Sequence, residues 1–166
     1  MDDQADAPGV DGMVVPPGGG RAFRFGPNRL TVKVGPEAKG QFGVIESVIP
    51  PSGGPALHRH QRYDEAFYVL EGPIEYRVGE RWVTATAGTF VFAPAGSAHG
   101  FRNGGASDAR HLVIAAPVEA LDMIEAASSV APDQIVQTFA RYDTELVDAG
   151  TASAATELSG TCPCAR

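Results

Sequence analysis

The stretch from His58 to Gly72 reads HRHQRYDEAFYVLEG, and it combines potential metal ligands with a strand-like run. His58 and His60 are two residues apart, a spacing that puts both side chains on one face of an extended strand. Glu65 then begins the apolar run Ala66–Leu70. A carboxylate that starts a buried strand is costly unless it is paired or binds a metal ion. The stretch therefore predicts two imidazoles and a carboxylate that can reach one ion.

A second stretch supplies a third imidazole. His99 follows the turn sequence Pro94-Ala95-Gly96. Three imidazoles and one carboxylate suit one divalent transition metal ion, either Fe, Mn, Ni, Co, Cu or Zn, with positions left for water or substrate. The fourth histidine, His111, lies within an apolar run, and we expect it to have a structural or surface role.

Short apolar runs separated by glycine and proline fill the middle of the chain, which has 20 Gly and 13 Pro among its 166 residues. Their β-branched and aromatic residues are typical of strands, and their close spacing predicts an all-β sandwich or barrel. The expected strands are Arg29–Val34, Gln41–Val48, Ala66–Leu70, Ile74–Val78, Trp82–Thr86, Thr89–Ala93, His99–Arg102 and His111–Ala115.

The pattern changes to helical spacing after Pro117. Apolar residues predict one helix over 118–128 and a second from Pro132 to about Tyr142, because proline in a first turn favours a helix start. We therefore expect a flexible N-terminal arm over 1–20, one barrel domain over 21–117, helices packed on the barrel over 118–145 and a disordered tail over 146–166. Cys162 and Cys164 fall in this tail, where a disulfide between them could not cross-link the folded domain.

Charge and hydropathy exclude several classes of partner. The formal net charge is −7, and no clustered Lys and Arg suggest a surface for nucleic acid. No apolar run approaches the roughly 18 residues that would span a membrane. The first residues are acidic, unlike the start of a signal peptide, so we expect a cytoplasmic protein.

Two motifs in these stretches resemble the cupin superfamily, over about residues 40 to 116. The first contains His58, Arg59, His60, Glu65 and Gly72, and the second contains Gly88, Pro94, Ala95, Gly96, His99 and Asn103. One departure is Ser52, where the family usually has glycine. The resemblance implies a small antiparallel β-barrel, or jelly roll, here followed by two short C-terminal helices. It also implies four metal ligands that point into the barrel mouth: His58, His60, Glu65 and His99.

Other residues of the motifs have expected structural roles. Gly72, Gly88 and Gly96 would allow turns with positive φ. Pro94 would stiffen the approach to His99, and Asn103 would close a turn.

Strand alternation predicts the residues around the ligands. If Glu65 faces inward, Phe67 and Val69 do so too, and Phe101 accompanies His99. This lining suits an apolar or aromatic organic substrate, with Tyr63 and Arg62 as polar contacts at the rim. We expect Tyr68, Tyr76 and Trp82 on the exterior of the sheet or in a dimer contact.

Three functions fit these residues, and a dioxygenase is the one that we expect first. The sequence Asp64–Gly72 and the C-terminal helices look like single-domain cupins related to quercetin dioxygenases, which implies O2 as a co-substrate and Glu65 as base or ligand. The same ligands serve a non-redox isomerase, lyase, dehydratase or polyketide cyclase of secondary metabolism. The third function is a non-catalytic module that binds a ligand or a metal. Exposed sheet edges favour a homodimer, and the resemblance to the family implies the same.

Overall fold

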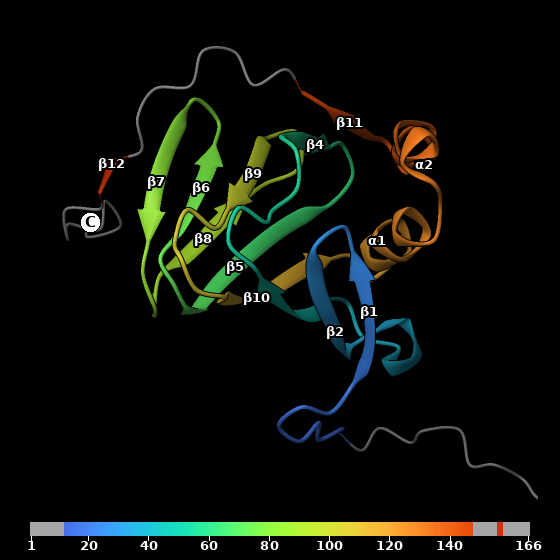
Figure 1. Ribbon diagram of the computed structural model, residues 1–166. Helices are drawn as coiled ribbons and strands as arrows, with labels where there is room; N and C mark the ends of the chain where they lie inside the picture. Colours follow the sequence, from blue (N-terminus) through green and yellow to red (C-terminus); the bar gives the residue numbers. More distant parts are fainter. Residues whose placement is uncertain (1–11, 148–155, 158–166) are drawn as a thin grey trace, which may run out of the picture.

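Two six-stranded β-sheets enclose the apolar core of the protein (Figure 1). The structure, a computed structural model, describes residues 12–147 and 156–157. The first sheet has the order β1-β2-β3-β10-β5-β8, formed by Arg21–Phe25, Asn28–Val34, Gly43–Ile49, Ala109–Ala116, Asp64–Glu71 and Phe90–Ala93. The second has the order β11-β4-β9-β6-β7-β12, formed by Thr144–Leu146, His58–His60, Ala98–Arg102, Ile74–Val78, Arg81–Ala85 and Thr156–Glu157.

Strand alternation creates the core. β3 and β10 pair antiparallel, and every second residue of each strand is buried. Ile45, Ile49 and Val113 thus face the interior, where Phe67 and Tyr76 meet them. All eight expected strands are present, and the all-β prediction is confirmed.

Two helices close one side of the first sheet. α1 spans Ala120–Ser128, and α2 spans Ile135–Arg141 after the 3-10 turn Pro132–Gln134. A further 3-10 turn covers Pro36–Ala38. α1 buries Leu121 so close to Gly43 that a Cβ there would overlap the leucine side chain. The two predicted helices are confirmed.

Three strands were not predicted, namely β1, β11 and β12; the last pairs with β7 at residues 156–157 and so contradicts the expected disordered tail at that point. β1 pairs with β2 as a hairpin, and β11 returns after α2 to pair with β4. β11 lies across the expected boundary between helices and tail, because residues 144–146 form strand hydrogen bonds at the open edge of β4. The expected N-terminal arm is described only from residue 12 onward, and Cys162 and Cys164 lie outside the described residues. In the described part of the chain, no helix is long and apolar enough to cross a membrane.

The expected turn residues behave differently from one another. Gly88 and Gly96 have φ of +87° and +81°, as predicted. The prediction for Gly72 is wrong, since its φ is not positive; glycine fits there because a Cβ would lie only 3.2 Å from the Ala85 carbonyl oxygen. Ser52 replaces the family's glycine with a φ of +62°.

Asn103 closes a turn, as expected. Its side-chain amide donates to the carbonyl oxygens of Ile49 and Ser107, and its Oδ1 accepts from the backbone of Gly105. Among the aromatic residues expected outside, Tyr68 is 40% exposed.

The placement of Tyr76 on the exterior is wrong. Tyr76 is 1% exposed, and its hydroxyl lies 2.6 Å from Nδ1 of His111. The inward side chains of β6 and β10 form this contact between the two sheets. His111 is itself fully buried, so its role is structural and not at the surface.

Candidate metal centre

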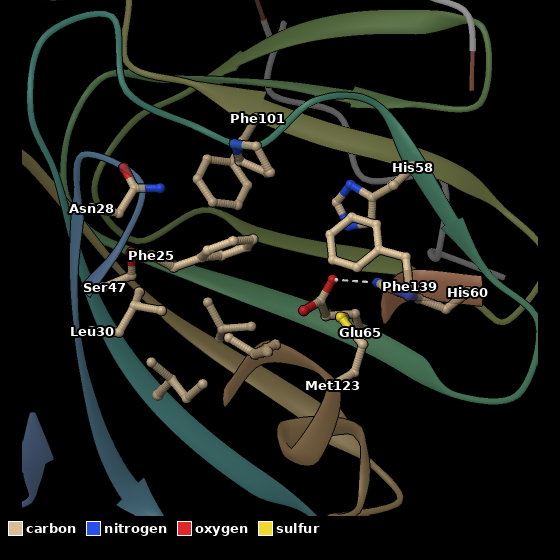
Figure 2. Close-up of a pocket in the computed structure, with 14 residues that line it drawn as sticks. Phe25, Asn28, Leu30, Ser47, His58, His60, Glu65, Phe101, Met123 and Phe139 are labelled. Carbon is tan, nitrogen blue, oxygen red and sulfur yellow. Dashed lines mark ion pairs between the residues drawn. The ribbon is translucent and has the colours of Figure 1, made fainter. Parts of the chain in front are cut away.

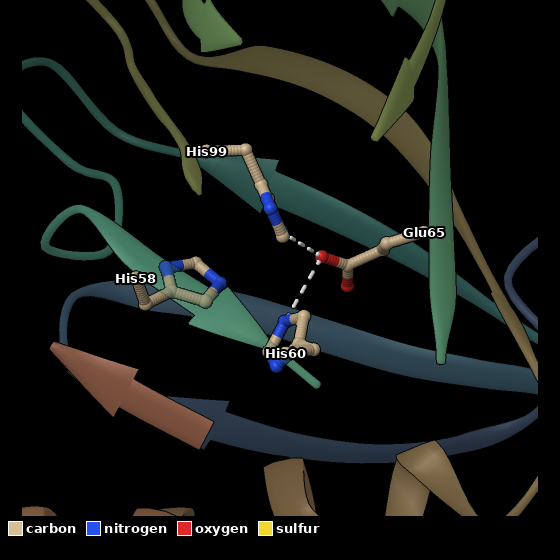
Figure 3. A group of neighbouring side chains, drawn as sticks. All are labelled: His58, His60, Glu65 and His99. Atoms are coloured by element: carbon tan, nitrogen blue, oxygen red, sulfur yellow. Dashed lines mark hydrogen bonds and ion pairs between the residues drawn. The ribbon is translucent and has the colours of Figure 1, made fainter. Parts of the chain in front are cut away.

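Four side chains from both sheets converge at one point inside the barrel (Figure 3). The three-residue strand β4 presents His58 and His60 on one face, and its register places His58 opposite His99 of β9. Glu65 reaches the same point from β5 in the other sheet. All four side chains are buried, and their potential ligand atoms lie within 4.8 Å of one another. The structure thus brings together the four residues that the motifs singled out.

The outer ring nitrogen of each histidine is already engaged. Nδ1 of His58 donates to the Ala56 carbonyl oxygen at 2.7 Å, and Nδ1 of His99 donates to the Ser97 carbonyl oxygen at 2.9 Å. Nδ1 of His60 lies 2.9 Å from Oγ1 of Thr144. Such contacts fix the ring orientation and leave Nε2 as the atom available to a metal ion.

The inner atoms fit a divalent ion. Oε2 of Glu65 lies 2.8 Å from Nε2 of His99 and 3.5 Å from Nε2 of His60. Nε2 of His60 is buried and has no hydrogen-bond partner among the described residues. A buried polar atom without a partner is costly, and coordination would satisfy it. Three imidazole nitrogens and one carboxylate oxygen form a donor set for a divalent transition ion.

His58 and Glu65 are in the charge states that coordination requires. Burial, with the neighbouring His99 and His60, lowers the pKa of His58 to about 4, so this imidazole is neutral at pH 7. Burial alone would raise the pKa of Glu65, but its interactions with His60 and His99 outweigh burial and hold the pKa well below its usual range. Burial likewise opposes a charge on His99, yet the hydrogen bond to Glu65 raises the pKa of that imidazole. The carboxylate is therefore ionised, as a ligand must be.

An apolar pocket opens onto this site (Figure 2). The free space inside the pocket is about 70 Å³, smaller than most small-molecule sites, so a bound molecule of several rings also requires side-chain movement around it. Its lining comprises Phe25, Asn28, Leu30, Ile45, Ser47, Pro55, His58, His60, Glu65, Phe101, Val113, Met123, Ile124 and Phe139. Among the described residues that line the pocket there is no Lys or Arg, and Glu65 is the one carboxylate. The two helices contribute a wall through Met123, Ile124 and Phe139.

Only one of the four predicted pocket residues lines this cavity. Phe101 does so, whereas Phe67, Val69 and Tyr63 do not. Phe67 stacks on His111 with ring centres 5.5 Å apart, and Val69 is fully buried in the core. Alternation identified inward-facing residues, but it does not distinguish the core of the barrel from its cavity.

Tyr63 lies behind the metal centre and not at the rim. Its ring stacks on His60 with centres 4.1 Å apart, and its hydroxyl lies 3.2 Å from Oγ1 of Thr144. Burial raises the pKa of Tyr63. Tyr63 and Thr144 therefore support His60 from behind. Arg62 is exposed and pairs with Asp143.

Several pocket residues were missed by the sequence reasoning. Phe25 and Phe139 come from elements that lie far from the motifs, and they meet edge to face with ring centres 6.4 Å apart. No sequence pattern indicates that contact. Ser47 could have been found, because it alternates with Ile45 and Ile49 on the buried face of β3.

Comparisons with known proteins support the fold described above. Residues 45–115 match the cupin domain family, whereas no curated protein matches the sequence. The chain is similar to a predicted oxalate decarboxylase from Thermotoga maritima, with 22% identity and a TM-score of 0.59 over 63% of this chain and 99% of that one. It is also similar to KdgF from Halomonas sp., with 16% identity and a TM-score of 0.57 over 64% of this chain and 94% of that one.

A third similar structure is the polyketide cyclase RemF from Streptomyces resistomycificus. Its identity is 25% and its TM-score is 0.50, over 62% of this chain and 84% of that one. The first two structures support the fold alone. The domain match and the two sheets lead to one conclusion: the chain carries a cupin domain, and its fold is that of the cupin superfamily.

Proposed function

We propose that the protein is a metal-dependent enzyme that acts on a neutral, largely apolar organic molecule. The observation that carries the proposal is the apolar pocket that ends on His58, His60 and Glu65. Sites for phosphate or carboxylate groups usually provide Arg or Lys, and this lining has neither. An uncharged aromatic or aliphatic substrate fits such a lining better than a sugar phosphate does.

The ligands of the ion would be His58, His60, Glu65 and His99. When bound there, a divalent ion polarises a substrate oxygen as a Lewis acid. Phe101, Phe25 and Phe139 exclude water from the pocket and hold a flat ring system by apolar contact. Glu65 faces the same pocket, where it would hold the ion beside that oxygen and neutralise part of its charge.

A non-redox reaction, such as isomerisation, elimination or ring closure, is the reaction that we favour. The similarity to a polyketide cyclase supports this choice. In such a reaction a proton leaves an acidic carbon and returns to another carbon, or leaves with a displaced hydroxyl group as water, so no electrons leave the substrate.

A dioxygenase of the quercetinase type is the second candidate. It is favoured by the sequence Asp64–Gly72, which resembles that group and forms the strand that positions Glu65. The homodimer expected from the sequence stays a prediction.

Oxygen dependence separates the two candidates. The metal-loaded protein is incubated with enolisable aromatic ketones and with flavonols, in air and under nitrogen, while products are followed by mass spectrometry and oxygen by electrode. Turnover that persists under nitrogen supports the non-redox proposal. Turnover that requires oxygen and consumes it in proportion to product supports the dioxygenase. A ligand that binds tightly and is recovered unchanged would favour a binding module instead.

A further inference from the structure

Two polar side chains lie in the same pocket, away from the metal centre. Asn28 of β2 and Ser47 of β3 line the pocket, and they are 5% and 0% exposed. Oδ1 of Asn28 and Oγ of Ser47 are buried without a hydrogen-bond partner in the described part of the chain. Figure 2 shows both side chains at the end opposite His60 and Glu65.

The fold itself does not account for these two residues. A buried polar atom without a partner destabilises a protein, whereas an apolar residue of the same shape does not. The neighbours of Ser47 on the same strand face are Ile45 and Ile49, as expected for a plain core strand. Polar groups that stay unpaired in such a place are better explained by a partner that arrives with a ligand.

Strand register gives the length of that ligand. Strand β10 lies between β5 and β3. Its residue Ala115 pairs with Glu65 of β5 on one side and with Gly43 of β3 on the other. Its residue His111 pairs with Ser47 of β3. Ser47 is therefore four residues further along the sheet than Glu65, or about 13 Å at the usual rise per residue. This span is the greatest length that a molecule reaching from Glu65 to Ser47 has to bridge.

We propose that Asn28 and Ser47 bind a neutral carbonyl or hydroxyl oxygen at the far end of an elongated, flat aromatic substrate. The inference rests on the proposed function, in which the near end of the substrate lies at the metal centre. An amide and a hydroxyl can each donate and accept hydrogen bonds. Neither carries a charge, so they select a neutral oxygen and not a carboxylate or phosphate. Phe25 and Phe101 lie between the two ends and would contact the rings.

Two probes that differ by one hydroxyl group test the proposal. Binding of 2,6-dihydroxyanthraquinone and of 2-hydroxyanthraquinone to the zinc-loaded protein is measured by calorimetry in a mildly acidic buffer. We expect the dihydroxy probe to bind about tenfold more tightly, in line with one or two neutral hydrogen bonds. The double variant Ser47→Ala with Asn28→Leu should lose this preference and bind 2-hydroxyanthraquinone as the wild type does.

Two controls separate recognition from folding. Ser129→Ala removes an exposed hydroxyl directly after α1, which donates to the Glu125 carbonyl oxygen, and should keep the preference. The thermal midpoint of Ser47→Ala should be equal to or higher than that of the wild type, because an unpaired hydroxyl has been removed; a structural role would lower it.

The outcomes are distinguishable. Equal affinity of the wild type for both probes, or a preference that survives in the double variant, would overturn the inference and leave the proposed function standing. Failure of both probes to bind, or binding that is unchanged in His60→Ala, would overturn the proposed function together with the inference.

Discussion

Nδ1 of His60 lies 2.9 Å from Oγ1 of Thr144, a residue that the chain reaches only after both C-terminal helices. The register of β11 on β4 places the two residues opposite each other. Thr144 is 3% exposed, and its hydroxyl lies 3.4 Å from the Tyr142 carbonyl oxygen, to which it donates. Nδ1 of His60 can thus donate to Thr144 while Nε2 stays free to bind a metal ion. A strand that follows both helices in the sequence thereby orients a ligand that lies in the much earlier strand β4.

Loss of the Thr144 hydroxyl should weaken metal binding. Thr144→Val keeps the shape of the side chain but removes the acceptor for His60, and groups behind a ligand typically contribute 10- to 100-fold in affinity. We expect a loss of about that size in a competition titration with a chelator. Thr144→Ser keeps the hydroxyl and should bind the ion nearly as well as the wild type. Equal affinity in Thr144→Val would show that this contact does not support the ligand.

Removal of the Glu65 carboxylate should abolish turnover. Glu65→Gln has the same shape but no charge with which to hold the ion, and we expect turnover of an identified substrate to fall at least about 100-fold. Glu71→Gln changes a carboxylate at the other end of β5, which is paired with Arg110 at the surface, and it should keep turnover. The comparison requires rates at saturating substrate with metal content measured for each variant. Equal rates in Glu65→Gln and wild type would remove Glu65 from the mechanism.

His111 should make the protein less stable in acid. Burial lowers its pKa to about 3, against 6.5 in an unfolded chain. Between these two values the unfolded chain binds a proton that the folded chain does not, so stability is present above pH 6.5 and is lost as pH falls toward 3. One such group contributes a slope of up to about 1.4 kcal/mol per pH unit. The free energy of unfolding of His111→Gln should therefore depend less steeply on pH over this window.

Tyr76→Phe is the matched control for that measurement. It removes the hydroxyl that contacts His111 but keeps the imidazole buried, so the steep pH dependence should remain. If the free energy of unfolding of His111→Gln depended on pH as steeply as that of the wild type, the acid sensitivity would come from other groups. His58 is one of them, because its pKa is lowered to about 4.

Two glycines should differ in their tolerance of alanine. Gly54 has a φ of +138°, and a Cβ there would overlap the carbonyl oxygen of Phe101. Gly88 has a φ of +87°, but no atom lies within 4 Å of its Cβ position. Gly88→Ala should thus cost about 1 kcal/mol of stability, and Gly54→Ala should cost clearly more and displace the pocket wall at Phe101. Denaturant unfolding of both variants measures the difference, and equal losses would contradict it.

The motifs predicted the ligands because their chemistry is local. His58 and His60 share a strand, and the strand of Glu65 follows after a short turn, so spacing alone constrains them. The pocket was less predictable because its walls come from distant elements. The positions of Phe25 and Phe139 depend on how the β1–β2 hairpin and α2 pack, which no spacing encodes. Thr144 was missed because its strand is only three residues long.

Metal content tests the central claim most directly. Wild-type protein and His99→Ala, purified without chelators, are compared by elemental mass spectrometry, with His111→Gln as a histidine control outside the cluster. Since His58, His60, Glu65 and His99 form one donor set, we predict about one divalent transition ion per wild-type chain and per His111→Gln chain. In His99→Ala the ion should be nearly absent while the β-rich circular dichroism spectrum is retained. A folded His99→Ala protein with full metal content would contradict the account.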